Sequence, residues 1–143
     1  MMMIKGPYRI VLADDHAMFR HGLKSVLTKE DDLDVIGEAG DGLELLTLLT
    51  SAKLAPHMAI IDISMPNLGG LEATSKIKGA YPDMKVLILS MHREKEYVQK
   101  ALSVGADGYL LKQDSSAELF TAIEKIRQGG VYFSPLLCDV DGF

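Results

Sequence analysis

The sequence predicts a doubly wound α/β domain, with a five-stranded parallel sheet and helices on both of its faces. Three observations lead to this prediction: short apolar runs recur along the chain, amphipathic stretches separate them, and the first run is continuously apolar rather than alternating. Strands that alternate with helices form right-handed βαβ crossovers, so the strands lie parallel in one sheet. The 143 residues, of which 48% are hydrophobic, suffice for one domain with one sizeable core.

The expected strands are the apolar runs themselves. Residues 10–13 are apolar at every position, as in a strand that is buried on both faces. Each of the other runs ends near a glycine, a proline, a serine or a charged residue, where a strand would stop. These runs are residues 35–36, 58–61, 86–89 and 109–111.

The helices are expected between these runs, and the first and last have the clearest signals. An apolar face with the i, i+4, i+7, i+8 spacing of a helix consists of Phe19, Leu23, Val26 and Leu27. The last helix has a capping-box pattern at Ser115 and Glu118, and Gly129 ends it. Its apolar stripe is Leu119, Ala122, Ile123 and Ile126. Residues 43–49, 71–77 and 97–102 supply three weaker helices.

Charge and composition exclude several classes of protein. Lysine and arginine number 15 against 20 acidic residues, and the net charge of −5 opposes non-specific binding to nucleic acid. The single cysteine, Cys138, cannot form an internal disulfide or a multi-cysteine zinc site, which favours a reducing compartment. No apolar run is long enough to cross a bilayer, and residues 1–7 contain no signal-peptide core. We therefore expect a cytoplasmic protein with no membrane partner.

Polar residues follow four of the five expected strands. They are Asp14 and Asp15 after the first strand, Asp62 after the third, Ser90 after the fourth and Lys112 after the fifth. In doubly wound sheets ligands bind beyond the carboxyl ends of the strands, so these side chains could converge on one crevice. Three carboxylates held together repel one another, and a hard cation such as Mg²⁺ offsets this through oxygen ligands. A lysine and a hydroxyl add a counter-charge and a donor for an anion, so the cluster predicts phosphoryl transfer.

Each of these residues also has an ordinary structural interpretation. Asp14 and Asp15 could form a solvated loop or a helix N-cap, and Asp62 could belong to a turn. Ser90 could cap a helix, and Lys112 could be a surface charge. Their shared position, each at the same end of a parallel strand, favours the functional interpretation.

The histidines are not expected to act as general bases or as metal ligands in this site. His16 and His92 are close to it in sequence, but neither has a second histidine at metal-ligand spacing, so we expect both to be exposed to solvent. His21 and His57 are likewise isolated.

Taken together, the motifs resemble the receiver domain of bacterial two-component response regulators. They are Asp14-Asp15, Asp62-Ile-Ser-Met-Pro66 with Gly70, Leu89-Ser90-Met91-His92, and the Gly-Ala-Asp-Gly-Tyr-Leu-Leu-Lys segment at 105–112. The last segment is most similar to the NarL/FixJ-type subfamily. The resemblance covers residues 9–135 and implies a flavodoxin-like, CheY-like fold.

By this resemblance, Asp62 is the phosphoacceptor and takes its phosphoryl group from a sensor histidine kinase or from a small acyl phosphate. Asp15 would bind Mg²⁺ directly, and Asp14 directly or through water. Asp62 itself and the main-chain carbonyl of Ser64 complete the implied set of metal ligands.

The resemblance also implies how the switch is read out. Lys112 would pair with the phosphoryl oxygens, Ser90 would donate a hydrogen bond to one of them, and Tyr109 occupies the family's aromatic switch position. We expect Tyr109 to shift from an exposed to a buried rotamer once Ser90 moves inward, the alternative being a half-buried sheet residue. Gln113 stands where the family often has a proline after a cis bond. The Lys112–Gln113 bond is therefore expected to be cis if the fold holds it so, or trans in a different local turn.

The implied function is a phosphorylation-dependent switch rather than a turnover enzyme, with Ser64 and His92 tuning the lifetime of the acyl phosphate. The receiver is expected over residues 8–135, with 136–143 as the start of a linker or a C-terminal tail. Subfamily members usually carry a LuxR-type helix-turn-helix domain after the receiver and control transcription through it. We expect a fragment or a stand-alone receiver, which contacts DNA only through an absent domain and can form a homodimer on phosphorylation.

Three alternatives belong to other classes of function. An aspartyl-phosphate hydrolase generally has a second acid two residues after its nucleophile, where this chain has Ser64. A degenerate receiver that only binds other proteins would depart from the motif at one of the five site residues, and none departs here. A flavin-binding domain would have a Ser/Thr/Gly-rich phosphate loop after the first strand, where this chain has Asp14-Asp15-His16.

Overall fold

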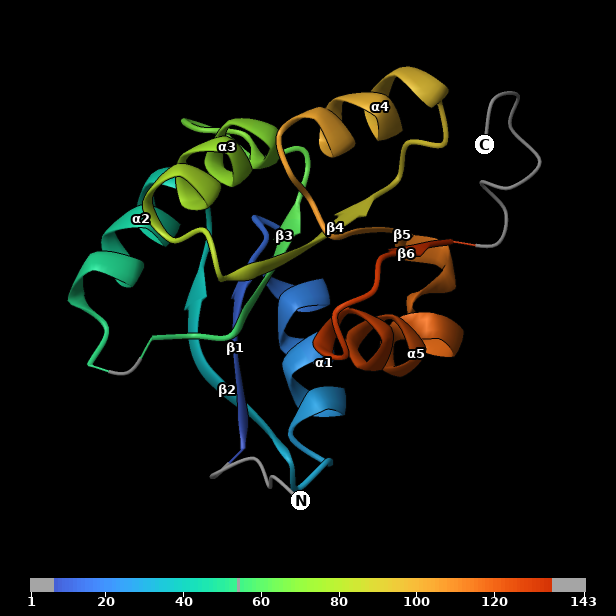
Figure 1. The fold of residues 1–143 in the computed structure, drawn as a ribbon. Helices are drawn as coiled ribbons and strands as arrows, with labels where there is room; N and C mark the ends of the chain where they lie inside the picture. Colours follow the sequence, from blue (N-terminus) through green and yellow to red (C-terminus); the bar gives the residue numbers. More distant parts are fainter. Residues whose placement is uncertain (1–6, 54, 135–143) are drawn as a thin grey trace.

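A computed structural model describes residues 7–53 and 55–134 of the chain (Figure 1). All strands pair in parallel in one sheet, in the order β2-β1-β3-β4-β5-β6. The strands are β1 (Tyr8–Ala13), β2 (Leu33–Ala39), β3 (Met58–Asp62), β4 (Lys85–Ser90), β5 (Gly108–Leu111) and β6 (Tyr132–Phe133). The helices are α1 (Ala17–Leu27), α2 (Gly42–Ser51), α3 (Gly70–Ala80), α4 (Lys95–Ser103) and α5 (Ser115–Arg127), with a 3₁₀ turn at Lys112–Asp114.

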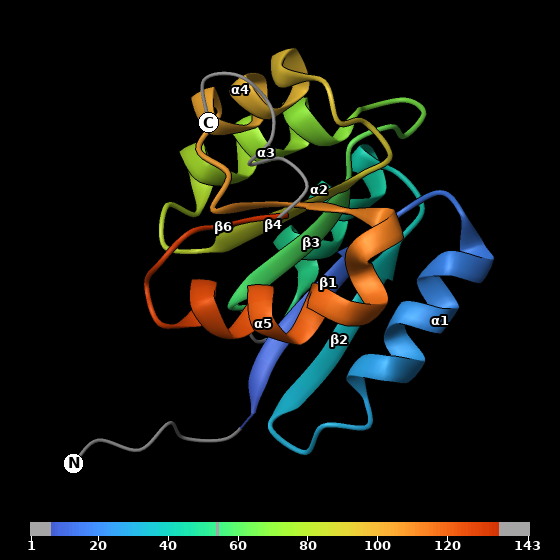
Figure 2. The ribbon, with the colours of Figure 1, turned by 90° about the vertical axis from the view of Figure 1, so that its right-hand side faces the viewer.

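The helices cover both faces of the sheet (Figure 2). They bury two separate apolar layers. α1 and α5 pack on one face, where Leu27 and Ile126 belong to the same buried cluster as Ile10 and Leu12 of β1. α2, α3 and α4 pack on the other face, which receives the alternate residues of the strands such as Val11. Because successive side chains of a strand point to opposite faces, a strand between two helical layers must be apolar throughout. This explains the continuous apolar run of β1 and confirms the predicted fold class.

The strand order reverses between β1 and β3. The chain passes from β1 outward to β2, then returns to pair β3 on the other side of β1. Crossovers on the two sides of this point lead to opposite faces of the sheet, which opens a crevice at the carboxyl ends of β1 and β3. Asp14 and Asp62 lie at these two strand ends.

Among the described residues the sheet has six strands, so the predicted count of five is wrong by one. The additional strand, β6, pairs with β5 so that Tyr132 lies opposite Gly108 and Phe133 opposite Tyr109. Ser134 then extends this edge, since its buried hydroxyl accepts a hydrogen bond of 2.7 Å from the Leu111 N–H. The sequence analysis placed these residues inside the receiver but assigned no strand to them, because two residues are too short to show a strand pattern.

Two details of the helices also differ from the sequence prediction. Val26 is 40% exposed, so the buried positions of α1 are Leu23 and Leu27. The predicted capping box is wrong: Ser115 donates its hydroxyl hydrogen bond to the Lys112 carbonyl, and Glu118 accepts one from the Tyr132 hydroxyl. The Glu118 side chain, which would have completed the capping box, thus bonds Tyr132 of β6 instead.

Some predictions fall on parts of the chain that the structure does not describe. The expected end of the domain at Pro135, the expected tail at 136–143 and Cys138 lie outside the described residues. Among the residues that are described, no helix combines the length and the apolar character needed to span a membrane.

Candidate functional site

The carboxylates of Asp14 and Asp62 lie buried at the crevice between β1 and β3, with 2% and 3% of these residues exposed. Lys112 reaches both of them from the end of β5. Its Nζ lies 2.9 Å from Asp14 Oδ2 and 3.2 Å from Asp62 Oδ1. The Lys112 side chain is only 10% exposed and its Nζ also lies 4.6 Å from the centre of the Phe19 ring. Lys112 is therefore part of a buried charge cluster, and its interpretation as a surface charge is wrong.

Backbone contacts hold the main chain of Asp14 in place and bring α3 close to Asp62. The Asp14 N–H donates to the Ala39 carbonyl at 3.0 Å, and the Arg20 guanidinium donates to the Asp14 carbonyl. Gly70 begins α3 directly against the end of β3, where a Cβ would overlap the Asp62 carbonyl oxygen. Glycine at this position lets α3 approach the acidic cluster closely.

The electrostatics of Asp62 are those of a carboxyl group that lacks a full counter-charge. Burial is the main cause that raises the pKa of Asp62 from 3.8 to about 6, and the nearby Asp14 carboxylate adds to the rise. Lys112 acts in the opposite direction, and Asp15 raises the pKa further. Three carboxylates and one ammonium thus leave net negative charge in a buried crevice, which favours a bound cation.

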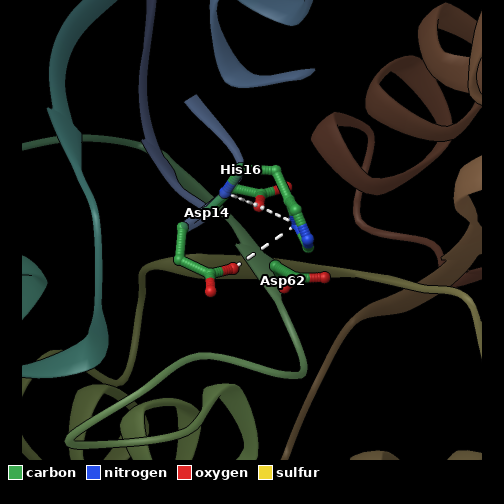
Figure 3. Close-up of side chains that lie close together, drawn as sticks. Asp14, His16 and Asp62 are labelled. Atoms are coloured by element: carbon green, nitrogen blue, oxygen red, sulfur yellow. Dashed lines mark hydrogen bonds and ion pairs between the residues drawn. The ribbon is translucent and has the colours of Figure 1, made fainter. Parts of the chain in front are cut away.

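Asp15 and His16 lie on the solvent side of the same cluster. The side chain of Asp15 is 35% exposed and that of His16 is 61% exposed. His16 Nδ1 lies 3.1 Å from Asp14 Oδ1 (Figure 3). It also lies 3.4 Å from Asp15 Oδ1. The prediction that His16 is exposed is confirmed, but the sequence interpretation missed its contact with the carboxylates. Its place directly after Asp15 was the available signal.

Ser90 and Tyr109 connect the site to α4 through His92. Ser90 is fully buried at the end of β4 and its Oγ accepts the His92 N–H at 2.8 Å. Tyr109 is also fully buried, and its hydroxyl donates to the His92 carbonyl at 2.8 Å. Burial is the main cause that raises the pKa of Tyr109 to about 12. The half-buried alternative for Tyr109 is wrong, and the structure has the buried rotamer that we expected only after phosphorylation.

The predictions for His92 and Ser64, the two residues expected to flank the site, are confirmed only in part. His92 is half-buried rather than fully exposed, because its ring stacks on Tyr97 at a centroid distance of 4.0 Å. The Ser64 hydroxyl lies 3.5 Å from His92 Nε2, so these two residues border the site together. The role of the Ser64 carbonyl as a metal ligand stays a prediction.

Lys112 reaches the site through a trans bond. No cis peptide bond occurs among the described residues, and Lys112 begins a 3₁₀ turn that continues to Asp114. Of the two geometries that Gln113 left open, the structure thus has the trans bond in a different local turn. The ammonium still reaches both Asp14 and Asp62.

The cluster meets the requirements of a magnesium site. Asp62 Oδ2 is buried and has no hydrogen-bond partner among the described residues, which is costly for a charged oxygen unless a cation or donor satisfies it. Carboxylate oxygens are the ligands that Mg²⁺ prefers, and Mg²⁺ retains several waters, which suits a site open on the side of Asp15. The residues present therefore fit the ion that the resemblance implied.

Comparison with known proteins identifies the family. A model of the response regulator receiver domain matches residues 10–124. This chain belongs to the response regulator receiver domain family. The chain is 40% identical over 127 residues to the transcriptional regulatory protein DegU of Brevibacillus brevis, which covers 89% of this chain and 53% of DegU. It is also 40% identical over 128 residues to the oxygen regulatory protein NreC of Staphylococcus carnosus, covering 89% and 58%. The receiver thus spans little more than half the length of these relatives.

Solved receiver structures agree with this assignment. A LuxR-family response regulator from Aurantimonas superimposes with a TM-score of 0.86 at 33% identity, covering 93% of this chain and 94% of that chain. The receiver domain of NarL from Mycobacterium tuberculosis superimposes with a TM-score of 0.80 at 32% identity, covering 87% and 99%. The isolated receiver domain of RcsB from Salmonella enterica, solved with the phosphomimetic BeF₃⁻, has a TM-score of 0.85 at 25% identity over 93% and 97%. The predicted NarL/FixJ-type resemblance is confirmed.

Proposed function

We propose that this receiver accepts a phosphoryl group on Asp62. One observation carries the proposal: Asp62 ends β3 in a buried crevice with its Oδ2 unpartnered among the described residues, while its Oδ1 lies 3.2 Å from the Lys112 ammonium. A free, anionic oxygen beside a fixed cation is what a carboxylate nucleophile for phosphorus needs. As in other receivers, the covalent product is an acyl phosphate.

The chemistry is an in-line displacement. An Asp62 oxygen forms a bond to phosphorus while the bond to the leaving oxygen or nitrogen breaks, and the leaving group retains the electron pair. Lys112 holds charge on the phosphoryl oxygens, and the Ser90 hydroxyl donates a hydrogen bond to one of them. Asp14, Asp15, Asp62 and the Ser64 carbonyl would hold Mg²⁺, which neutralises charge on the same oxygens when bound.

The donor and the output follow from the family. We propose a sensor histidine kinase as the phosphoryl donor in the cytoplasm, with small acyl phosphates as substitutes. The site is that of a self-dephosphorylating switch rather than of a turnover enzyme, since Ser64 stands where hydrolases have a second acid. We propose that phosphorylation favours a homodimer and controls transcription through a DNA-binding domain, in keeping with the name of one longer relative, the transcriptional regulatory protein DegU. Among the similar solved structures, RcsB forms two dimers that are bound to two parallel DNAs.

Intact mass spectrometry after incubation with acetyl phosphate and Mg²⁺ tests the proposal. The wild-type chain is expected to gain one phosphoryl group, and Asp62→Asn none. Asp83→Asn is a matched control because Asp83 is an exposed carboxylate at the opposite end of the sheet, and it should be labelled like the wild type. Continued labelling of the Asp62→Asn chain would remove Asp62 as the acceptor.

A further inference from the structure

His16 contributes a nitrogen atom to the acidic cluster, and the sequence patterns assign it no role there. Its Nδ1 lies 3.1 Å from Asp14 Oδ1 and 3.4 Å from Asp15 Oδ1. Figure 3 shows the imidazole beside the carboxylates of Asp14 and Asp62. One ligand atom from each of Asp14, Asp15, His16 and Asp62 can be chosen so that all four lie within 4.8 Å of one another. This spacing is close to what one shared ion requires, since ligands at about 2.0–2.2 Å span at most about 4.4 Å.

A second observation indicates that this group is built to hold a ligand. Asp62 is only 3% exposed, and its Oδ2 has no hydrogen-bond partner in the described part of the chain. A buried, unsatisfied carboxylate oxygen costs free energy unless a cation completes it. The cluster therefore combines a buried carboxylate oxygen that needs a cation with an imidazole nitrogen on its exposed side, from which an ion can enter.

The backbone holds His16 at this position. The His16 N–H donates to Asp14 Oδ1 at 2.8 Å, and His16 is the N-cap residue of α1. The Cα of His16 is thus tied to the carboxylate itself, so only the side-chain torsions remain to be fixed when an ion binds. The 61% exposure of the ring leaves room for that adjustment.

The other described histidines are not placed for this role. His57 Nδ1 accepts the Arg9 N–H at 2.8 Å at the opposite end of the sheet. His92 stacks on Tyr97, and its nearest carboxylate is Glu94 at 3.8 Å. His21 is exposed on α1 and belongs to no group of metal-ligating side chains among the described residues.

A mixed set of nitrogen and oxygen donors favours a different class of ion from an all-oxygen set. Mg²⁺ prefers oxygen ligands, whereas imidazole nitrogen suits first-row transition metals, whose affinities for such sites rise toward the end of the series. We propose that His16 Nδ1 ligates a first-row transition-metal dication together with the carboxylates of this cluster, and that this makes the site bind such ions more tightly than Mg²⁺. The inference rests on the proposed function, because it uses the same carboxylates.

Lys112 opposes every cation at this site but does not decide between them. Its Nζ lies 3.3 Å from His16 Nδ1 and 2.9 Å from Asp14 Oδ2, so an incoming dication meets this positive charge whatever its identity. Two dications of equal charge experience nearly the same repulsion. The ratio of Ni²⁺ to Mg²⁺ affinity therefore isolates the contribution of the imidazole.

Titration calorimetry of the whole chain with NiCl₂ and with MgCl₂ tests the proposal. His16→Ala is expected to weaken Ni²⁺ binding by about tenfold or more, and to change Mg²⁺ affinity by less than about threefold because Mg²⁺ selects oxygen ligands. His21→Ala is the matched control, because it removes a neighbouring exposed histidine outside the cluster, and it should leave both affinities as in the wild type.

Two results would overturn the inference. One is an unchanged Ni²⁺ to Mg²⁺ affinity ratio in His16→Ala. The other is an unchanged Ni²⁺ affinity in Asp62→Asn, since that would place the ion at surface histidines rather than in the cluster. Labelling of the same wild-type sample by acetyl phosphate with Mg²⁺ separates this failure from that of the proposed function. A chain that is labelled normally but shows no effect of His16→Ala keeps its function as a receiver and loses only the proposed nitrogen ligand.

Discussion

The carboxylates at the two ends of the sheet differ in how completely they are satisfied. At the amino end, Asp107 precedes β5, and its Oδ2 accepts hydrogen bonds from Lys78 Nζ at 2.8 Å and from the Val86 N–H at 2.9 Å. At the carboxyl end, Asp62 Oδ2 has no hydrogen-bond partner among the described residues. Both carboxylates are largely buried, with 17% and 3% of the side chains exposed. Burial alone therefore does not distinguish them; the partners do.

The same contrast extends to the neighbouring residues. At the amino end, Tyr8 stacks on His57 at a centroid distance of 4.8 Å and the Arg127 guanidinium lies 4.7 Å from the Tyr8 ring. At the carboxyl end, the buried side-chain oxygens without a hydrogen bond are Asp14 Oδ2, Asp62 Oδ2 and Asp114 Oδ2 among the described residues. Asp14 Oδ2 still has the Lys112 ammonium at 2.9 Å, as an ion pair without hydrogen-bond alignment. One end of the sheet thus stabilises the fold, and the other retains unfavourable electrostatics that a cation and a phosphoryl group can relieve.

Substitutions at the two ends of the sheet are expected to differ most in their effect on the rate of phosphorylation by acetyl phosphate. Lys112→Ala should lower the initial rate by about a hundredfold or more, because it removes the fixed cation that would stabilise the phosphoryl oxygens. Lys85→Ala is the control, since Lys85 begins β4 at the amino end and is half-buried. Time-resolved intact mass spectrometry measures both rates. Equal rates in the two variants would show that the charge cluster has no catalytic role.

The next largest effect concerns stability at the amino end. Tyr8→Ala should lower the free energy of unfolding by about 2–4 kcal/mol, because a ring that is only 6% exposed and has two stacking partners is lost. Tyr8→Phe retains the ring and should cost much less. Urea unfolding gives both values. Tyr8→Ala protein that is still folded should be phosphorylated at the wild-type rate. A lower rate would contradict the conclusion that the two ends of the sheet act independently.

A matched pair of substitutions should change stability in opposite directions. Asp62→Asn should raise the free energy of unfolding of the metal-free chain at pH 7–8 by about 1–3 kcal/mol, since the buried charge is removed. Asp107→Asn should lower it by about 1–3 kcal/mol, since the Lys78 ion pair is lost. Urea unfolding in the presence of a chelator measures both, and changes of the same sign would overturn the contrast.

The pH dependence of the Asp62→Asn effect follows from the pKa of Asp62. Because this pKa is raised to about 6 in the folded chain, the folded state binds a proton more tightly than the unfolded state. The wild type therefore loses stability as the pH rises from about 4 to about 6, and Asp62→Asn lacks this loss. The gain from Asp62→Asn should shrink toward zero near pH 4. A gain that does not depend on pH would exclude charge burial as its cause.

The smallest expected effect lies at the link between the site and α4. Tyr109→Phe removes the hydrogen bond to the His92 carbonyl and should cost about 0.5–1.5 kcal/mol, with the ring still filling its place in the core. Amide NMR shifts should change around His92 and not around His57 at the amino end. Changes that spread equally to both ends would show that the two ends are not independent.

Much of the site could be predicted because of how parallel sheets are built. Asp62, Ser90 and Lys112 each follow an apolar run, and the carboxyl ends of parallel strands meet at one edge, so their order along the chain was enough to bring them together. The contact of His16 with Asp14 could not be predicted in this way. It depends on the turn between β1 and α1, where the His16 N–H donates to Asp14 Oδ1.

Sequence patterns were sufficient to predict the fold class, five of the strands, the helices and the acidic cluster, because hydrophobic periodicity and strand-end position are local properties. Folding in three dimensions made residues 132–133 a sixth strand, since two residues gain strand geometry from pairing with β5. It also decided the buried rotamer of Tyr109, whose hydroxyl finds its partner in the His92 carbonyl of a different element. Likewise, Glu118 turned to the Tyr132 hydroxyl instead of closing a capping box. In each case the partner is distant in sequence, and a contact between distant residues exists only once the chain has folded.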